Sequence, residues 1–587
     1  MTGIVGVGPD GPSLSALLAP VHQEPWYETD RAEAGDYGLA IVHHGTKDPG
    51  GWHCWQDGRR AGVIHGAITN LDAFDGRYER LFARVFEAPA ETLRRLDGPF
   101  LLAAVDDRAE RLLVATDKLG ARPCYYATED GFAFGSNAAS PLAGVENPTV
   151  DVQGVSDMVM LGQVWGEKTL VEEVSTLPPA TVLESQEGSV STEAYWQLDV
   201  DVSPKKDPFT PIVNAYRRAM ADTSATMDGS VGLWLSGGLD SRTMASELSR
   251  NLSSLVTYTY DANPAGGGNI EIAKRIAERV GAENELVPLT PDRFVDVFET
   301  AVSLTGGMLT WRTFLNLTAV FNIDEPTDLI LEGCGQGTLM GAGIGQTLLG
   351  QHEMPEEVLY HAKHQTDRAT VQSVLAPDVD PMATYRTVVA DAPSTDPAET
   401  ALTAYYRNYV ARGEFASNRI ARSQVGSRVP LVDGEFLTAA TDLPLSYRER
   451  AIPFTGGKIP AGAAKGKFEF TRALDDGLSD IPYERTKFPP SYPHWLHTVG
   501  FVADTGSKRL LGKTAYGGRR MQSRWYESND RLRALVDGLL DDAATRPVFD
   551  ADTLQTLRRA HGAGEANNLG PLAAVSTVES WLQQHLE

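Results

Sequence analysis

Residues 231–241 decide the fold of this chain, and they read Val-Gly-Leu-Trp-Leu-Ser-Gly-Gly-Leu-Asp-Ser. The apolar run Val231–Leu235 predicts a buried strand, two glycines permit a tight turn, and a helix is predicted from about Ser241 to Ser249. Backbone N–H groups at such a turn, together with the helix dipole, form an anion site. The full pattern S-G-G-x-D-S therefore predicts a phosphate-binding loop rather than a plain strand-to-helix turn.

The side chains of this loop indicate what it binds. Ser236 and Ser241 offer hydroxyl donors to phosphate oxygens. Asp240 would repel phosphate unless it held a cation, so it is a candidate Mg²⁺ ligand. We predict a site for the pyrophosphate part of ATP, with these contacts: Leu235, Ser236, Gly237, Gly238, Asp240 and Ser241.

Strand and helix patterns alternate around the loop. Leu255–Tyr260 predicts a second strand and Ile270–Val280 a second helix, while Pro211–Met227 predicts a helix before the loop. This alternation is typical of a parallel sheet. The remaining chain, to residue 587, predicts mainly helices.

The first 200 residues predict a β-rich fold of another kind. Turn residues flank most of its short apolar runs, and a helix is predicted over Asn70–Phe86. A polar, proline-flanked stretch near 202–208 predicts a linker. The apolar runs are Ile4–Val7, Gly38–Val42, Ala61–Ile64, Phe100–Val105, Arg111–Ala115 and Gly131–Phe134.

Length and charge bound the class of protein. A chain of 587 residues is too long for one core, so we expect at least two domains. The net charge is −26, with 13 lysines against 39 arginines. An acidic, lysine-poor surface disfavours nucleic acid and anionic membranes as partners, and it favours a halophilic source.

Cysteine usage and hydropathy indicate the cellular compartment in which the protein is expected. Three scattered cysteines form neither a disulfide framework nor a CxxC pair, which favours a reducing cytoplasm. No basic segment followed by a hydrophobic stretch opens the chain, and no run of about 18 apolar residues occurs. We therefore expect a cytoplasmic protein.

The chain resembles the asparagine synthetase family, whose ATP pyrophosphatases carry the S-G-G-x-D-S loop. The matching segments keep the family's order along nearly the whole sequence. They are Gly3–Gly6, Asp117–Tyr126, Gly135–Ala138, Leu177–Ala180, Tyr195-Trp196, Val429–Asp433, Phe468–Ala473 and Arg485–Lys487.

The resemblance implies two domains in an α/β protein. Residues 1–202 would form an αββα nucleophile-hydrolase-like sandwich, and residues 208–587 a parallel-sheet ATP-pyrophosphatase domain with a helical C-terminal part. In the family a carboxylate attacks ATP, giving an acyl-adenylate and pyrophosphate, and ammonia or an amine then attacks the acyl carbon. The resemblance implies catalytic roles for Asp240 and Lys487, and adenine contacts at Thr259 and Tyr260.

Residues 1–202, which correspond to the family's glutaminase domain, depart from the family pattern. Thr2 stands where the family has its cysteine nucleophile. Threonine serves as a nucleophile in other amidohydrolases, which keeps Thr2 a candidate catalytic residue. However, His65 replaces the oxyanion-hole asparagine, and Ala67 replaces the glutamate that binds the glutamine amino group. These changes predict that glutamine is no longer hydrolysed.

Residues 208–587, which correspond to the family's synthetase domain, depart from the family pattern at Leu331–Gly341. Gly333 survives and suits a close approach to ribose or substrate. Cys334 replaces a glutamate needed for adenylation, Gly337 replaces the second Mg²⁺-binding aspartate, and Thr338 replaces the next acid. Glu332 remains a candidate Mg²⁺ ligand, and a loss of carboxylates weakens a site for this hard cation.

Three functions remain open. The first is an ATP- and Mg²⁺-dependent ligase that joins ammonia or an amine to a small-molecule or peptide carboxylate. The second is a non-catalytic nucleotide-binding homologue in a biosynthetic pathway, and the third is a true glutamine-hydrolysing asparagine synthase. A homodimer is the candidate assembly.

Overall fold

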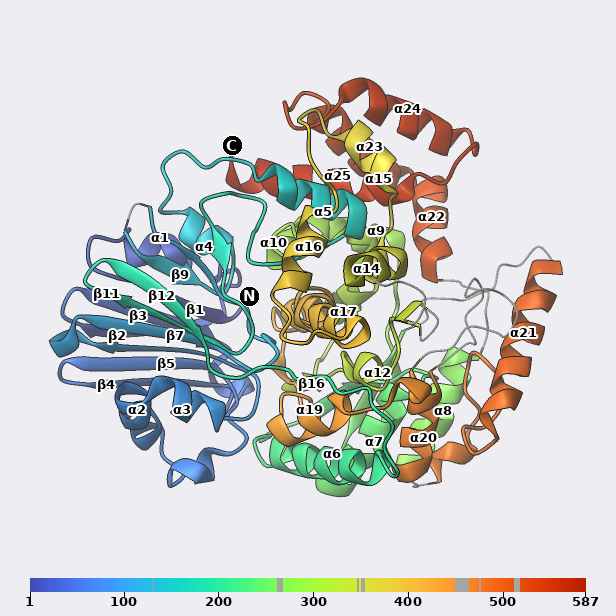
Figure 1. Ribbon diagram of the computed structural model, residues 1–587, viewed down its shortest axis with the longest axis horizontal. Coiled ribbons are helices and arrows are strands. Elements are labelled where there is room, and N and C mark those ends of the chain that lie inside the picture. Colours follow the sequence, from blue (N-terminus) through green and yellow to red (C-terminus); the bar gives the residue numbers. More distant parts are fainter. Residues whose placement is uncertain are drawn as a thin grey trace.

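The computed structural model describes residues 1–129, 131–260, 268–345, 348–349, 354–448, 464–474, 477–510 and 518–587. Figure 1 shows two parts side by side, a layered sandwich in blue to cyan and a larger part that contains a parallel sheet. The predicted α/β fold class is confirmed. The domain limits at residues 202 and 208 stay predictions.

Two six-stranded antiparallel sheets form the sandwich. The first has the order β10-β8-β9-β1-β3-β2, and the second β12-β11-β7-β6-β5-β4. The strands of the first are β1 (Gly3–Val7), β2 (Glu28–Ala34), β3 (Tyr37–His43), β8 (Tyr125–Ala127), β9 (Ala133–Gly135) and β10 (Ser175–Thr176). Those of the second are β4 (Trp52–Asp57), β5 (Arg60–Gly66), β6 (Phe100–Asp106), β7 (Arg111–Thr116), β11 (Thr181–Gln186) and β12 (Ser189–Ala194).

Apolar clusters show that helices cover both outer faces of the sandwich. Leu39 and Ile41 of one sheet pack against Leu101 and Val114 of the other, which fills the space between the sheets. Separate clusters join each sheet to its outer helices. These helices are α2 (Tyr78–Glu87) and α3 (Pro89–Arg94) on one side, and α1 (Leu14–Leu18) and α4 (Ala139–Leu142) on the other. The layers are therefore αββα, as predicted.

The apolar runs did not reveal the edge strands. β2, β4 and β12 are edges with largely exposed or half-buried side chains, so they lack an apolar signal. The helix predicted over Asn70–Phe86 was wrong in extent. A short 3₁₀ turn at Leu71–Phe74 precedes α2, and left-handed residues Asp75 and Gly76 separate the two.

The second part contains a five-stranded, wholly parallel sheet in the order β15-β14-β13-β16-β17. Its strands are β13 (Val231–Trp234), β14 (Val256–Thr259), β15 (Glu283–Leu286), β16 (Leu329–Leu331) and β17 (Gly426–Arg428). The predicted helices around the loop are α6 (Phe209–Ser224), α7 (Asp240–Asn251) and α8 (Asn269–Val280). Because β13 lies at the centre, its carboxyl end is where a ligand is expected in such a sheet.

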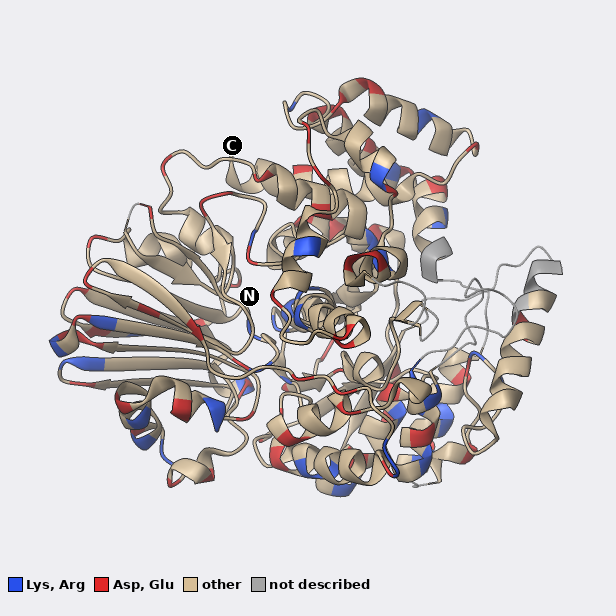
Figure 2. Ribbon diagram, viewed as in Figure 1, with Lys and Arg blue, Asp and Glu red and all other residues tan. Residues whose placement is uncertain are grey.

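Helices make up most of the rest. Within the described residues, no helix has both the length and the apolarity needed to cross a bilayer. Figure 2 shows acidic and basic residues spread over both parts of the molecule. The helices are α5 (Val152–Leu161), α9 (Pro291–Asp296), α10 (Phe298–Leu304), α11 (Trp311–Phe314), α12 (Gln336–Leu339), α14 (Pro355–Lys363), α15 (Arg368–Val374), α16 (Ala383–Ala390), α17 (Pro397–Tyr405) with a π-helical continuation (Tyr406–Glu414), α18 (Ala416–Ala421), α19 (Gly434–Thr441), α20 (Lys465–Leu474), α21 (His494–Leu510), α22 (Gly518–Ser528), α23 (Asp530–Ala543), α24 (Ala551–Gly562) and α25 (Leu569–His585).

Candidate functional site

The predicted phosphate loop lies between β13 and α7 and is held closed by its two serines. The Ser236 nitrogen donates to Ser241 Oγ at 3.1 Å, and the Gly238 nitrogen donates to Ser236 Oγ at 3.2 Å. The two hydroxyl oxygens are 3.1 Å apart. The loop leads directly into the 12-residue helix α7. The first turn of this helix carries the positive end of the helix dipole.

Asn269 connects the loop to the neighbouring strand. The Gly237 nitrogen donates to Asn269 Oδ1 at 2.8 Å, and Asn269 Nδ2 donates to the carbonyl of Tyr260 at 3.2 Å. Asn269 is the first residue of α8, directly after Gly268, whose φ of +103° places it in the left-handed region. The helix predicted over Ile270–Val280 did not include Asn269. A polar residue at the start of a helix is visible in the sequence, but its contact with Gly237 is not.

Arg242 fixes the back of the loop. Its buried guanidinium donates to the carbonyls of Gly238 and Gly237 at 3.0 and 3.3 Å. It also donates to three carbonyls of the segment that leads to Lys487, those of Leu478, Ile481 and Pro482, at 2.6 to 3.1 Å. The loop and this distant segment are thus held in one arrangement.

Lys487 lies beside the same loop. The Glu484 nitrogen donates to the Gly237 carbonyl at 3.3 Å, which docks the turn before Lys487 on the glycines. Lys487 has a φ of +63°, an unfavourable conformation for a side chain larger than glycine. A Cβ placed on Gly268 would lie 3.3 Å from Lys487 Nζ, so the ammonium lies beside the start of α8.

Asp240 is paired with a lysine that the sequence did not single out. Lys467 Nζ lies 2.6 Å from Asp240 Oδ2. Burial acts to lower the pKa of Lys467, but the Asp240 carboxylate outweighs it and the pKa is raised above its usual value. The lysine is therefore cationic at neutral pH.

The 332–338 segment, in which other residues stand where the family has acids, packs directly on the loop. A Cβ at Gly333 would be 3.3 Å from Asp240 Cβ and from the Ser241 nitrogen, a tight contact that favours glycine at this position. Cys334 Sγ lies 3.0 Å from Ser417 Oγ and 3.6 Å from Glu332 Oε2. Burial raises the pKa of Glu332, and burial beside Glu332 raises the pKa of the Cys334 thiol. A thiol in this state is not a nucleophile at neutral pH.

A carboxyl group from elsewhere in the chain reaches this segment. Thr338 Oγ1 donates to Glu414 Oε1 at 2.5 Å. Burial raises the pKa of Glu414, with Asp240 among the nearby charges. Glu414 ends the π-helical segment, far from the loop in sequence, and no motif indicated it.

The described residues do not assemble an evident divalent-metal site. No group of three or more His, Cys, Asp and Glu side chains suited to a metal occurs among them. The Asp240 carboxylate pairs with Lys467, and the Glu332 carboxylate accepts from Cys334. The Mg²⁺ roles of Asp240 and Glu332 stay predictions.

The candidate adenine contacts differ in availability. Thr259 is fully buried and its hydroxyl donates to the Leu235 carbonyl at 2.9 Å, so it joins two strands. Tyr260 is partly buried, with its ring 5.3 Å from that of Trp234. Burial, with Glu332 nearby, raises the pKa of Tyr260. The Thr259 hydroxyl is therefore already used, and the adenine contacts at Thr259 and Tyr260 stay predictions.

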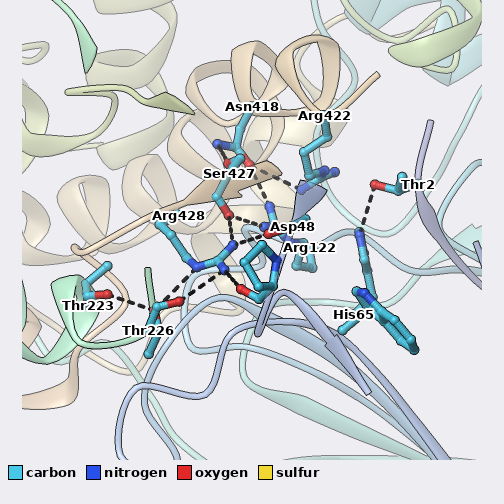
Figure 3. A network of polar contacts seen from close by, with 12 residues as sticks. Thr2, Asp48, His65, Arg122, Thr223, Thr226, Asn418, Arg422, Ser427 and Arg428 are labelled. Carbon is cyan, nitrogen blue, oxygen red and sulfur yellow. Dashed lines mark hydrogen bonds and ion pairs between the residues drawn. The ribbon is translucent and has the colours of Figure 1, made fainter. Parts of the chain in front are cut away.

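Thr2 and His65 meet in the sandwich, as Figure 3 shows. Thr2 Oγ1 lies 3.2 Å from His65 Nε2, and both side chains are buried. Met1 is also buried, and its amino group donates to the Val21 carbonyl at 3.1 Å. Thr2 and His65 thus form a buried polar pair.

Arginines surround this pair at the contact between the two parts (Figure 3). Arg122 of the sandwich donates to Asn418 Oδ1 at 2.5 Å, and Arg422 donates to the same oxygen at 3.2 Å. Arg428 donates to Asp48 at 2.7 Å. Burial, and then the charges of Arg122 and Arg422, lower the pKa of His65 well below its usual value. His65 is therefore a neutral imidazole in a positive environment.

Comparisons with known proteins agree with this architecture. The family model described as "Glutamine amidotransferase domain" matches residues 75–196, and the one described as "Asparagine synthase" matches residues 215–583. A protein of Mycobacterium tuberculosis (strain ATCC 25618 / H37Rv), provisionally named asparagine synthetase [glutamine-hydrolyzing], is 28% identical over 250 residues. The match covers 39% of this chain and 37% of that protein.

Asparagine synthetase [glutamine-hydrolyzing] 1 of Bacillus subtilis (strain 168) is 24% identical over 227 residues, which are 38% of this chain and 36% of the relative. The matched stretch is thus little more than a third of the length of these relatives.

Proposed function

We propose that this chain is an ATP-dependent carbon–nitrogen ligase. The chain belongs to the asparagine synthase family, because that family's model matches residues 215–583. It activates a carboxylate as an acyl-adenylate, releases pyrophosphate, and forms an amide with ammonia or an amine. Its acid substrate is a small molecule or a peptide.

The observation that carries the proposal is the arrangement around Ser236–Ser241. The start of α7 and two lysines converge at the carboxyl end of the central strand. Positive groups fixed in advance stabilise charge that develops on leaving pyrophosphate. Lys487, held beside the loop in a strained conformation, supports a role in that step.

Two observations support a nitrogen source other than glutamine. The α-ammonium of glutamine requires a nearby carboxylate, and Ala67 supplies none. The nearby guanidinium groups of Arg122 and Arg422 would instead repel it.

The non-catalytic alternative is favoured by one feature, the absence of acids at Cys334, Gly337 and Thr338. Glu414, hydrogen-bonded to Thr338, returns a carboxyl group to that segment and supports the ligase instead.

The test is release of pyrophosphate from ATP with a panel of carboxylic acids and either ammonium or glutamine. We expect release that depends on the acid, proceeds with ammonium and falls at least tenfold in Lys487→Gln. The matched control Lys465→Gln should retain full turnover. Nucleotide binding without turnover for any acid would favour the non-catalytic alternative, and turnover with glutamine alone would contradict the proposed nitrogen source.

A further inference from the structure

Three elements converge where a side chain is missing. Gly337 in α12, Asp240 at the start of α7 and Lys467 in α20 meet at one point. A Cβ built on Gly337 would lie 2.6 Å from Asp240 Oδ2 and 2.7 Å from Lys467 Nζ. These distances are too short for any real Cβ, so the lysine head occupies the space that a side chain at residue 337 would need.

The same point does not suit a divalent ion. Mg²⁺ requires near-octahedral oxygen ligands at about 2.0–2.1 Å. Residue 337 offers no side chain, and the Thr338 hydroxyl is donated to Glu414. Asp240 Oδ2, the carboxylate oxygen nearest to a Cβ on Gly337, already accepts from an ammonium at 2.6 Å.

The lysine replaces the charge that such an ion would bring. An unpaired Asp240 would repel phosphate, whereas the pair with Lys467 neutralises that charge. The Lys467 side chain is 14% exposed and that of Asp240 26% exposed, so both keep some contact with solvent. A lysine ammonium is a compact charge with three donors, and one bond to Asp240 leaves capacity for a phosphate oxygen.

The backbone holds this ammonium in place. Phe468, the next residue, is buried in a cluster with Leu239 and Tyr483, and Leu239 is the residue just before Asp240. A Cβ on Gly466 would lie 2.5 Å from the Met340 carbonyl, so α20 docks closely on the segment after Gly337. The lysine is therefore positioned by packing on both neighbouring elements.

We propose that the Lys467 ammonium is the built-in cation of the Ser236–Ser241 loop. It takes the place of a divalent ion beside Asp240 and contacts a phosphate oxygen of the bound polyphosphate directly. The phosphate contact rests on the proposed function, whereas the exclusion of a divalent ion does not. The consequence is a pyrophosphate site that binds its anion without a metal.

Metal binding tests the exclusion without any nucleotide. Mn²⁺ titrations of the full chain, followed by electron paramagnetic resonance, compare the wild type, Asp240→Asn and the double variant Gly337→Asp/Lys467→Gln. We expect Asp240→Asn to leave Mn²⁺ binding by the wild type unchanged. The double variant should gain one site, which addition of Asp240→Asn removes. An Asp240-dependent Mn²⁺ site in the wild type would overturn the proposal.

Calorimetry with inorganic pyrophosphate in EDTA tests the phosphate contact. We expect the wild type and the control Lys465→Gln to bind equally, and Lys467→Gln to bind roughly ten- to hundredfold more weakly, as for loss of a charged hydrogen bond. Wild-type binding only when Mg²⁺ is present would overturn the proposal. No binding under either condition would overturn the proposed function and the phosphate contact with it, while the Mn²⁺ titrations still decide the exclusion.

Discussion

Replacing Arg242 with methionine removes at least five hydrogen bonds from the back of the phosphate loop. The guanidinium donates to the carbonyls of Gly237 and Gly238 on one side, and to three carbonyls of residues 478–482 on the other. A hydrogen bond to a charged group contributes about 1.5–3 kcal/mol. Bonds that share one guanidinium do not add, and methionine refills most of the volume.

We therefore expect Arg242→Met to lower the free energy of unfolding by about 4 kcal/mol, in the range of broken buried networks. Arg242→Lys keeps the charge but can replace only some of the bonds, so about 2 kcal/mol is expected. The matched control is Arg250→Met on the same helix. Its side chain is 44% exposed and pairs with Glu247, and such pairs contribute about 0.5 kcal/mol.

Urea unfolding of the three variants, with pyrophosphate affinity measured on the folded proteins, distinguishes the roles. The loop and the segment before Lys487 share Arg242, so loss of affinity should accompany loss of stability. An Arg242→Met protein within 1 kcal/mol of the wild type would refute the view that this arginine holds the two segments together.

Further predictions concern other parts of the molecule. Thr2→Ala should leave acid-dependent pyrophosphate release with ammonium unchanged, and a fall in this release would contradict the prediction. Release of ammonia from glutamine by the wild type that Thr2→Ala abolishes would contradict the predicted loss of glutamine hydrolysis. Burial raises the pKa of Asp433 to about 6, so its folded-state pKa lies above the unfolded one. Wild-type stability should therefore fall as pH rises from about 4 to 6, by up to about 3 kcal/mol. Asp433→Asn keeps the N-cap and should abolish this fall in urea unfolding; an unchanged pH profile would refute it. Glu579→Gln should cost about 2 kcal/mol in the same assay, because the neutral amide can accept only one of the two hydrogen bonds from Arg546, whose other carboxylate partner, Glu587, is exposed. A loss below about 0.5 kcal/mol would argue otherwise.

Local sequence signals predicted the central strand, the loop and the helices around it. Val231–Ser241 combines an apolar run, two glycines and a helix start, and the structure places β13 and α7 there. The edge strands β2 and β12 were not predicted, because their exposed side chains remove the apolar alternation on which such predictions depend.

The residues that complete the site could not be predicted in this way. Lys467, Glu414 and Asn269 reach the loop from segments that are distant in sequence, and each is an ordinary polar residue in its own helix. Only the fold brings them to the carboxyl end of β13. A count of acids at residues 334–338 alone therefore leaves out the Glu414 carboxyl group that reaches this segment.

The sharpest test of acyl-adenylate formation is exchange of labelled pyrophosphate into ATP, in the presence of a carboxylic acid and without any nitrogen donor. We expect exchange that requires the acid, falls at least tenfold in Lys487→Gln and is unaffected by Lys465→Gln. Amide formation from ammonia without any such exchange, or exchange equal in the two lysine variants, would contradict an acyl-adenylate formed at the Ser236–Ser241 loop.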